Sequence, residues 1–67
     1  MSIIKIRELI GLSEKSFEDA LKNVIEHEVK VGKNVTGVKI KSQTVEIKEG
    51  KITTYKINAA VAYKWED

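Results

Sequence analysis

The pattern of apolar and polar positions along the chain predicts four elements, in the order strand, helix, strand and strand. Residues 3–10 are rich in Ile and Leu, and their adjacent apolar pairs are typical of a strand that is covered on both faces. Residues 35–48 and 51–65 predict two long strands. Gly50 supplies the positive φ that the two-residue loop between them requires. This order predicts an α+β fold with a β-α-β-β subunit.

A single helix is predicted over residues 13–31. Its apolar stripe recurs every three or four residues and consists of Phe17, Ala20, Leu21, Val24 and Ile25. Ser13 and Ser16 are alternative N-caps, because either hydroxyl can accept a hydrogen bond from an unpaired amide of the first turn. Gly11 is expected to close the first strand, and Gly32 to end the helix in a left-handed conformation.

The two-residue loop also sets the register of the predicted hairpin. Gln43 is expected to face Lys56, and Gly37 to face Ala62. One face of the hairpin then packs on the helix through Val38, Ile40, Tyr55, Ile57, Ala59, Val61 and Tyr63. The other face carries four lysines and an apolar patch at the hairpin tip: Lys39, Lys41, Lys56, Lys64, Val45, Ile47 and Ile52. Because the hairpin is longer than the helix, we expect subunits to associate over the uncovered part.

Composition and charge exclude several classes of function. The 67 residues allow one small domain, and the net charge of +2 lacks the clustered excess of a dedicated nucleic-acid binder. There is no Cys, so disulfides, zinc–thiolate sites and thiol catalysis are excluded. No apolar run is long enough to span a membrane, and a soluble cytoplasmic protein is expected. No nucleophile is paired with a base in the sequence, so we expect no enzyme activity.

Several short motifs, in this order and at this spacing, resemble the dodecin family. They are the run Ile6-Arg7-Glu8-Leu9-Ile10-Gly11, the Ser-x-x-Ser-Phe-x-x-Ala helix start in residues 13–20, and the strand segments in residues 34–43 and 50–63. The resemblance implies one dodecin-like domain over residues 1–67, with a three-stranded antiparallel sheet wrapped around one helix. It also implies a hollow homododecamer that stores or sequesters a small ligand and does not turn over a substrate.

The resemblance places a cofactor-binding site at Gly37, Gln43 and Lys56. Dodecins that bind flavin (FMN, FAD or riboflavin) stack the ring on a Trp and hold its polar edge with a Gln. These residues align with Gly37 and Lys56 here. Gly offers no π surface, and Lys has no hydrogen-bond acceptor. Flavin storage in a homododecamer is therefore one expectation, and a flavin-free structural assembly associated with calcium is the alternative.

Other polar and aromatic residues leave alternatives open. Trp65 is either a substitute stacking platform or an interface residue, and His27 is expected at the surface. The four lysines of the hairpin form either an anion site or a solvated face. The carboxylates available to a calcium site shared between subunits are Glu46, Glu49, Glu66 and Asp67.

Overall fold

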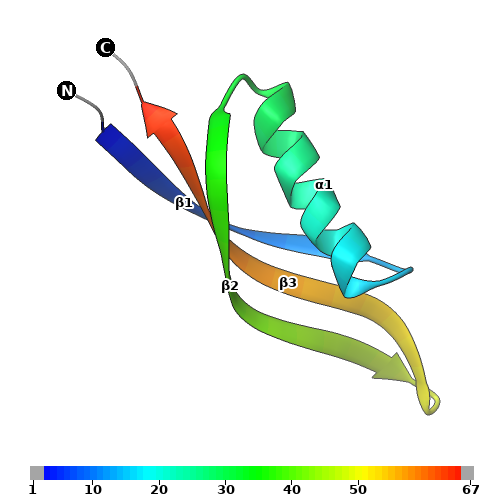
Figure 1. The fold of residues 1–67 in the computed structure, drawn as a ribbon. Coiled ribbons are helices and arrows are strands. Elements are labelled where there is room, and N and C mark those ends of the chain that lie inside the picture. Colours follow the sequence, from blue (N-terminus) through cyan, green and yellow to red (C-terminus); the bar gives the residue numbers. More distant parts are fainter. Residues whose placement is uncertain (1–2, 66–67) are drawn as a thin grey trace.

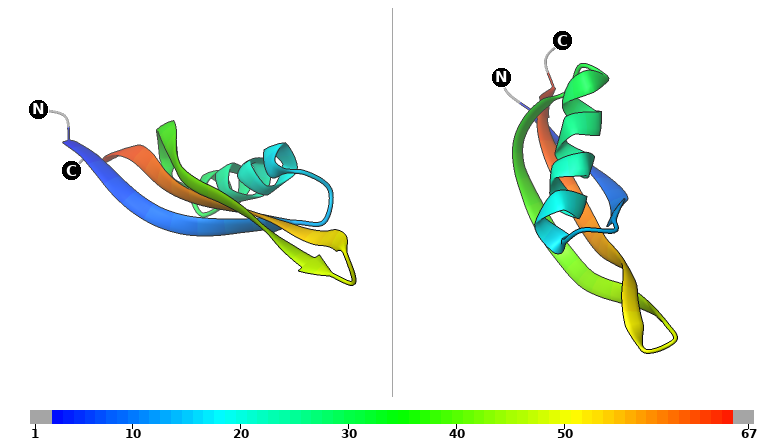
Figure 2. Two further views of the ribbon diagram at one scale, coloured as in Figure 1. Left: turned by 90° about the horizontal axis from the view of Figure 1, so that it is seen from below. Right: turned by 90° about the vertical axis from the view of Figure 1, so that its right-hand side faces the viewer.

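The computed structural model describes residues 3–65 as one curved sheet with a helix across one of its faces (Figure 1). The elements are β1 (Ile3–Ser13), α1 (Phe17–Lys30), β2 (Asn34–Lys48) and β3 (Lys51–Trp65). The sheet is antiparallel with strand order β1-β3-β2. This confirms the predicted β-α-β-β fold with a three-stranded antiparallel sheet. Figure 2 shows the sheet curving around α1 and the β2–β3 hairpin extending beyond it.

The connection between β1 and α1 differs from the prediction. Strand β1 continues past Gly11, and α1 begins only at Phe17. Ser16 is the N-cap, since its Oγ accepts a hydrogen bond from the amide of Asp19 at 2.9 Å. Ser13 ends the strand instead, and its hydroxyl accepts from the amide of Lys15 and donates to Asp19 Oδ2 at 2.7 Å. The alternative N-cap at Ser13 is therefore wrong, because its hydroxyl is engaged within the connecting turn.

The core lies between α1 and the central strand β3. Both edges of β3 are paired, with β1 and with β2, and α1 crosses one of its faces, so its inward side chains are the most enclosed. The buried apolar residues are Ala20 and Val24 from α1 and Ile57, Ala59 and Val61 from β3. We call the side of the sheet that α1 covers the helix face, and the opposite side the open face.

Three register shifts in the hairpin change which residues share a face. Gly37 pairs with Ala62 as predicted, but Gln43 pairs with Ile57 and Thr44 pairs with Lys56. Two of the shifts are bulges on opposite strands, which leave Thr53 of β3 and Lys41 of β2 without a direct cross-strand partner. At the third shift, Thr36 of β2 has no direct partner on β3. The two opposed bulges compensate each other, so the segment between them slips by one residue and the predicted register returns from Ile40 to Gly37.

This slip corrects the prediction for the hairpin tip. Val45 pairs with Tyr55, whose ring meets Phe17 of α1 edge-on at a centroid distance of 5.1 Å. Val45 and the pair Ile47–Ile52 therefore lie on the helix face, beyond the start of α1, and not on the open face. The apolar patch at the tip exists, but it extends the surface on which the helix packs.

Candidate ligand-binding face of the sheet

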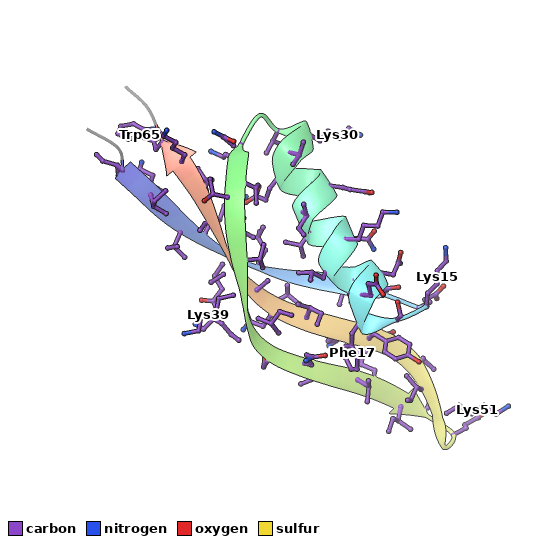
Figure 3. The ribbon with its side chains drawn as sticks, in the orientation of Figure 1. Lys15, Phe17, Lys30, Lys39, Lys51 and Trp65 are labelled. Atoms are coloured by element: carbon purple, nitrogen blue, oxygen red, sulfur yellow. The ribbon has the colours of Figure 1, made fainter. Side chains whose placement is uncertain are left out.

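The open face is a surface of cross-strand rows that no other part of residues 3–65 covers. From the chain termini toward the hairpin tip, the rows are Ile6, Ala62 and Gly37; Glu8, Ala60 and Lys39; Ile10, Asn58 and Ser42; and Leu12, Lys56 and Thr44. Figure 3 shows Lys39 pointing away from α1 on this side of the sheet. Apolar residues of β1, small residues of β3 and lysines thus occur together on one surface.

The three predicted site residues are only partly brought together. Gly37 and Lys56 both lie on the open face, but their rows are separated by six positions along β3, or about 20 Å at ~3.3 Å per residue. Gln43 pairs with Ile57, which is buried against the helix, so Gln43 lies on the helix face. The predicted juxtaposition of Gln43 and Lys56 is wrong, because the bulge at Thr53 shifts the register between them.

Gly37 leaves open space on the open face. A Cβ atom added there would meet no other atom within 4 Å, and its neighbour in the row is the small Ala62. Beyond Ala62, Ile6 is 63% exposed. This row offers an open apolar floor to a flat ligand but no aromatic ring on which to stack it, so it does not fit a flavin held by ring stacking.

Lys56 is engaged by a carboxylate of its own chain. Its Nζ lies 2.7 Å from Oε2 of Glu46, which comes from the next strand. The hydrogen bond from Lys56, followed by its positive charge, holds the pKa of the Glu46 carboxyl below its ordinary value. A ligand that uses Lys56 must therefore compete with Glu46, and the Lys56 position does not reproduce a side chain that both donates and accepts at a ring edge.

A second ion pair crosses the middle of the open face. Nζ of Lys41 lies 3.2 Å from both carboxylate oxygens of Glu8, so it reaches from β2 over β3 to β1. Lys41 can do so because it is the bulged residue of β2. Its hydrogen bond and charge, with a further hydrogen bond from Asn58, lower the pKa of the Glu8 carboxyl. Two of the four lysines predicted on this face are therefore neutralised within the subunit.

Sequence reasoning named Glu46 only as a carboxylate for a calcium site, and it missed that Glu8 and Glu46 lie on the open face as the partners of Lys41 and Lys56. In the predicted register, alternation from Val45 and Ile47 put Glu46 on the side of the helix, away from Lys56. The structure pairs Glu46 with Thr54, which places it on the open face. No local pattern marks the bulge that causes this change, so the sequence held no signal for this ion pair.

Replacing Lys56 by Met is expected to raise the pKa of Glu46 toward its ordinary value of about 4.3, because the positive partner is lost. In the native chain, the depressed pKa means that this ion pair stabilises the fold above pH ~4.3 and loses its effect as the pH falls through the lower folded value. The pair is exposed, so the change in stability is small. Carboxyl carbon chemical shifts measured against pH test this, with Glu8 and its intact Lys41 as internal control. An unchanged Glu46 titration would contradict the assignment.

The remaining candidate residues do not assemble a metal or catalytic centre within residues 3–65. No group of three or more His, Asp or Glu residues converges there. Glu66 and Asp67, two of the predicted calcium ligands, lie outside the described residues. His27 is exposed, as predicted. Trp65 is 41% exposed, and Nζ of Lys5 lies 4.1 Å from its ring centroid. The helix α1 is too short and polar to cross a membrane.

Comparison with known proteins places this fold in a family. The family model described as Dodecin matches residues 3–66. The chain belongs to the dodecin family. Comparison with curated proteins gave no match. The two positions that the resemblance aligns with the flavin site differ in their surroundings: an added Cβ atom at Gly37 would meet no other atom within 4 Å, and Lys56 is held by Glu46.

Solved dodecin structures superpose on this chain over nearly its whole length. The dodecin from Streptomyces coelicolor is 12% identical, covers 98% of this chain and 94% of its own, and gives a TM-score of 0.93. A protein from Thermus thermophilus is 22% identical with coverages of 100% and 98% and a TM-score of 0.92. A calcium-chelating antigen from Mycobacterium tuberculosis, named calcium dodecin, is 25% identical with coverages of 96% and 91% and a TM-score of 0.81. These likenesses establish the dodecin fold.

Proposed function

We propose that this protein is a non-enzymatic dodecin subunit, one domain over residues 1–67, that assembles into a cytoplasmic homododecamer and stores a small ligand on its open face. The observation that carries the proposal is that face, where the open space at Gly37 lies in one row with exposed Ile6, and where two ion-paired lysines, Lys41 and Lys56, lie farther along the same face. Membership of a family that binds and stores flavin supports it. Exposed apolar side chains on β1 and at the hairpin tip support association, because monomers rarely leave such surfaces uncovered.

The residues at the flavin positions favour a ligand other than a stacked flavin. Gly37 supplies no ring, and Lys56 is engaged by Glu46. Native mass spectrometry of the gently purified protein tests the proposal, because it reports assembly and bound mass together. A twelve-subunit mass carrying a small organic molecule is the expected result. A monomer or dimer would overturn the assembly, and a twelve-subunit mass that gains nothing when incubated with flavins, flavin nucleotides or coenzyme A would overturn the storage role.

A flavin-free structural assembly associated with calcium is the second candidate. The observation that favours it is again the loss of both flavin-site residues, and a family relative is described as a calcium dodecin. Adding calcium to chelator-treated protein distinguishes the two functions. Calcium retained in stoichiometric amounts, with no organic mass, would favour the structural assembly over ligand storage.

Replacing Gly37 by Trp together with Lys56 by Gln is expected to strengthen flavin binding at least about tenfold, since a stacked ring adds more than ~1.4 kcal/mol with the area it buries. The first atom of the new side chain at Gly37 meets no other atom within 4 Å, so it is accepted without a clash. Quenching of flavin fluorescence on titration measures the effect. The matched control pairs Thr36→Trp with Lys56→Gln, which places the ring one residue away at a bulge. Equal binding by both variants would show that the family geometry is not what was restored.

A further inference from the structure

We infer that the free edge of β1 pairs with β1 of a second copy, antiparallel and centred on Glu8, to join two three-stranded sheets into one. The inference rests on the proposed self-assembly and adds to it the surface and register of one contact. Strand β1 lies at one margin of the sheet (Figure 2), and only its inner edge is paired, with β3.

The two margins of the sheet differ in how they are protected against pairing. Edge strand β2 is interrupted by bulges at Thr36 and Lys41, which twist an edge and spoil its hydrogen-bonding row. Edge strand β1 pairs with β3 without any shift from Ile3 to Ser13 and contains no proline. A regular, unblocked edge of this kind is a template for another strand.

Charges on an edge strand normally prevent pairing, but those of β1 are turned toward their own subunit. Lys5 lies over the ring of Trp65 at 4.1 Å. Nε of Arg7 lies 3.5 Å from buried Glu28, and Glu8 is held by Lys41. On the outer edge from Lys5 to Gly11, the backbone groups are therefore not blocked by charged side chains. At its end, the carbonyl oxygen of Leu12 accepts a hydrogen bond from Asn23 Nδ2 at 3.0 Å, which sets the limit of the free stretch.

The side chains of β1 are self-complementary about Glu8. On the open face, an antiparallel pair centred there sets Ile6, 63% exposed, against Ile10 of the second copy, 65% exposed, and repeats the contact by two-fold symmetry. On the helix face, Arg7 meets Leu9, and Lys5 meets Gly11, beside which a groove of about 300 Å³ between β1 and α1 leaves room. A pair centred on Arg7 would instead oppose two guanidinium groups.

The charge at the centre is also compensated. The two Glu8 carboxylates would face each other across the two-fold axis, and each has a Lys41 ammonium at 3.2 Å. The four groups lie in the order cation, anion, anion, cation, so each carboxylate is paired with the ammonium of its own subunit, which weakens the repulsion between the two like charges directly opposite one another. The bulge at Lys41, which lets this side chain reach Glu8, thus has a role in the contact.

A single cysteine tests this register, because the chain has none of its own. In Glu8→Cys, the two new thiols lie opposite each other, with Cβ atoms about 4.5–5.5 Å apart, close to the separation of a disulfide. Mild oxidation should give a covalent dimer as the main product. The control is Thr36→Cys on the bulged edge of β2, where cross-linking is expected to be at least about fivefold lower. Circular dichroism confirms that both variants are folded.

A second pair of variants keeps the Glu8–Lys41 ion pair intact. Ile6→Cys and Ile10→Cys should each remain largely uncross-linked alone and form a disulfide heterodimer when mixed and reassembled. If Glu8→Cys and this mixture stay uncross-linked while native mass spectrometry still reports an oligomer, the β1 contact is wrong and the proposed assembly stands. A monomeric mass in the unmodified protein would overturn both.

Discussion

Replacing Arg7 by Met is expected to destabilise the subunit by about 3–5 kcal/mol, because it leaves a buried carboxylate without its cation. Glu28 lies on the inner side of α1 and is fully buried. Within residues 3–65, neither of its side-chain oxygens accepts a hydrogen bond. Nε of Arg7, at 3.5 Å from Oε1, supplies the compensating charge from β1. Without that charge, the free energy of folding includes the full cost of removing the Glu28 carboxylate from water.

The exposed pair Lys22–Glu26 on α1 provides a matched control. Its atoms are 3.8 Å apart and its side chains are 68% and 63% exposed, so Lys22→Met should change stability by less than about 0.5 kcal/mol. Urea unfolding at one fixed protein concentration measures both free energies, since association would otherwise shift them. Adding Glu28→Leu to Arg7→Met should recover most of the loss, because apolar residues often replace a buried ion pair without cost. Equal effects of Arg7→Met and Lys22→Met would contradict the buried pair.

Much of the fold could be predicted because it follows from local periodicity. The helical stripe from Phe17 onward packs on the sheet as expected, and the buried Glu28 lies one turn beyond Val24 on the same side of α1. The partner of Glu28 could not be predicted, since Arg7 belongs to another strand and only the packing of α1 across β1 brings them together. Spacing identifies which residues face inward, whereas tertiary geometry decides which charge compensates which.

The candidate site was less predictable because it depends on register. The hairpin loop set the pairing correctly at Gly37, which lies beyond both compensating bulges. Between the two bulges, a slip of one residue moves every side chain of the β2 segment to the other face of the sheet. It removed Gln43 from the site and brought Glu46 to Lys56. The bulges at Thr53 and Lys41 occur in segments whose residue types are typical of regular strands, so the sequence does not predict them.

Gly11 was expected to end a strand, but in the structure its absent side chain makes room for the helix. A Cβ at this position would overlap the carbonyl oxygen of Ala20 and Cγ2 of Val24, and would lie 3.2 Å from the carbonyl carbon of Ala20. Ala20 is fully buried, and its carbonyl belongs to the backbone of α1, so the helix itself must move. Gly11→Ala is therefore expected to destabilise the subunit by about 3 kcal/mol, the upper part of the range for overpacking.

Gly37→Ala is the matched control, because it adds the same methyl group to a strand glycine of the same sheet. Its Cβ meets nothing within 4 Å, so the change should be neutral or stabilise by up to ~1 kcal/mol as the unfolded chain loses freedom. Thermal unfolding of the two variants at equal concentration separates steric overlap from a general effect of replacing glycine. A loss of stability shared by both would show that strand flexibility, and not the approach of α1 to β1, requires glycine at position 11. A loss confined to Gly11→Ala would establish that this close approach fixes the helix on the sheet, and with it the face that stays open.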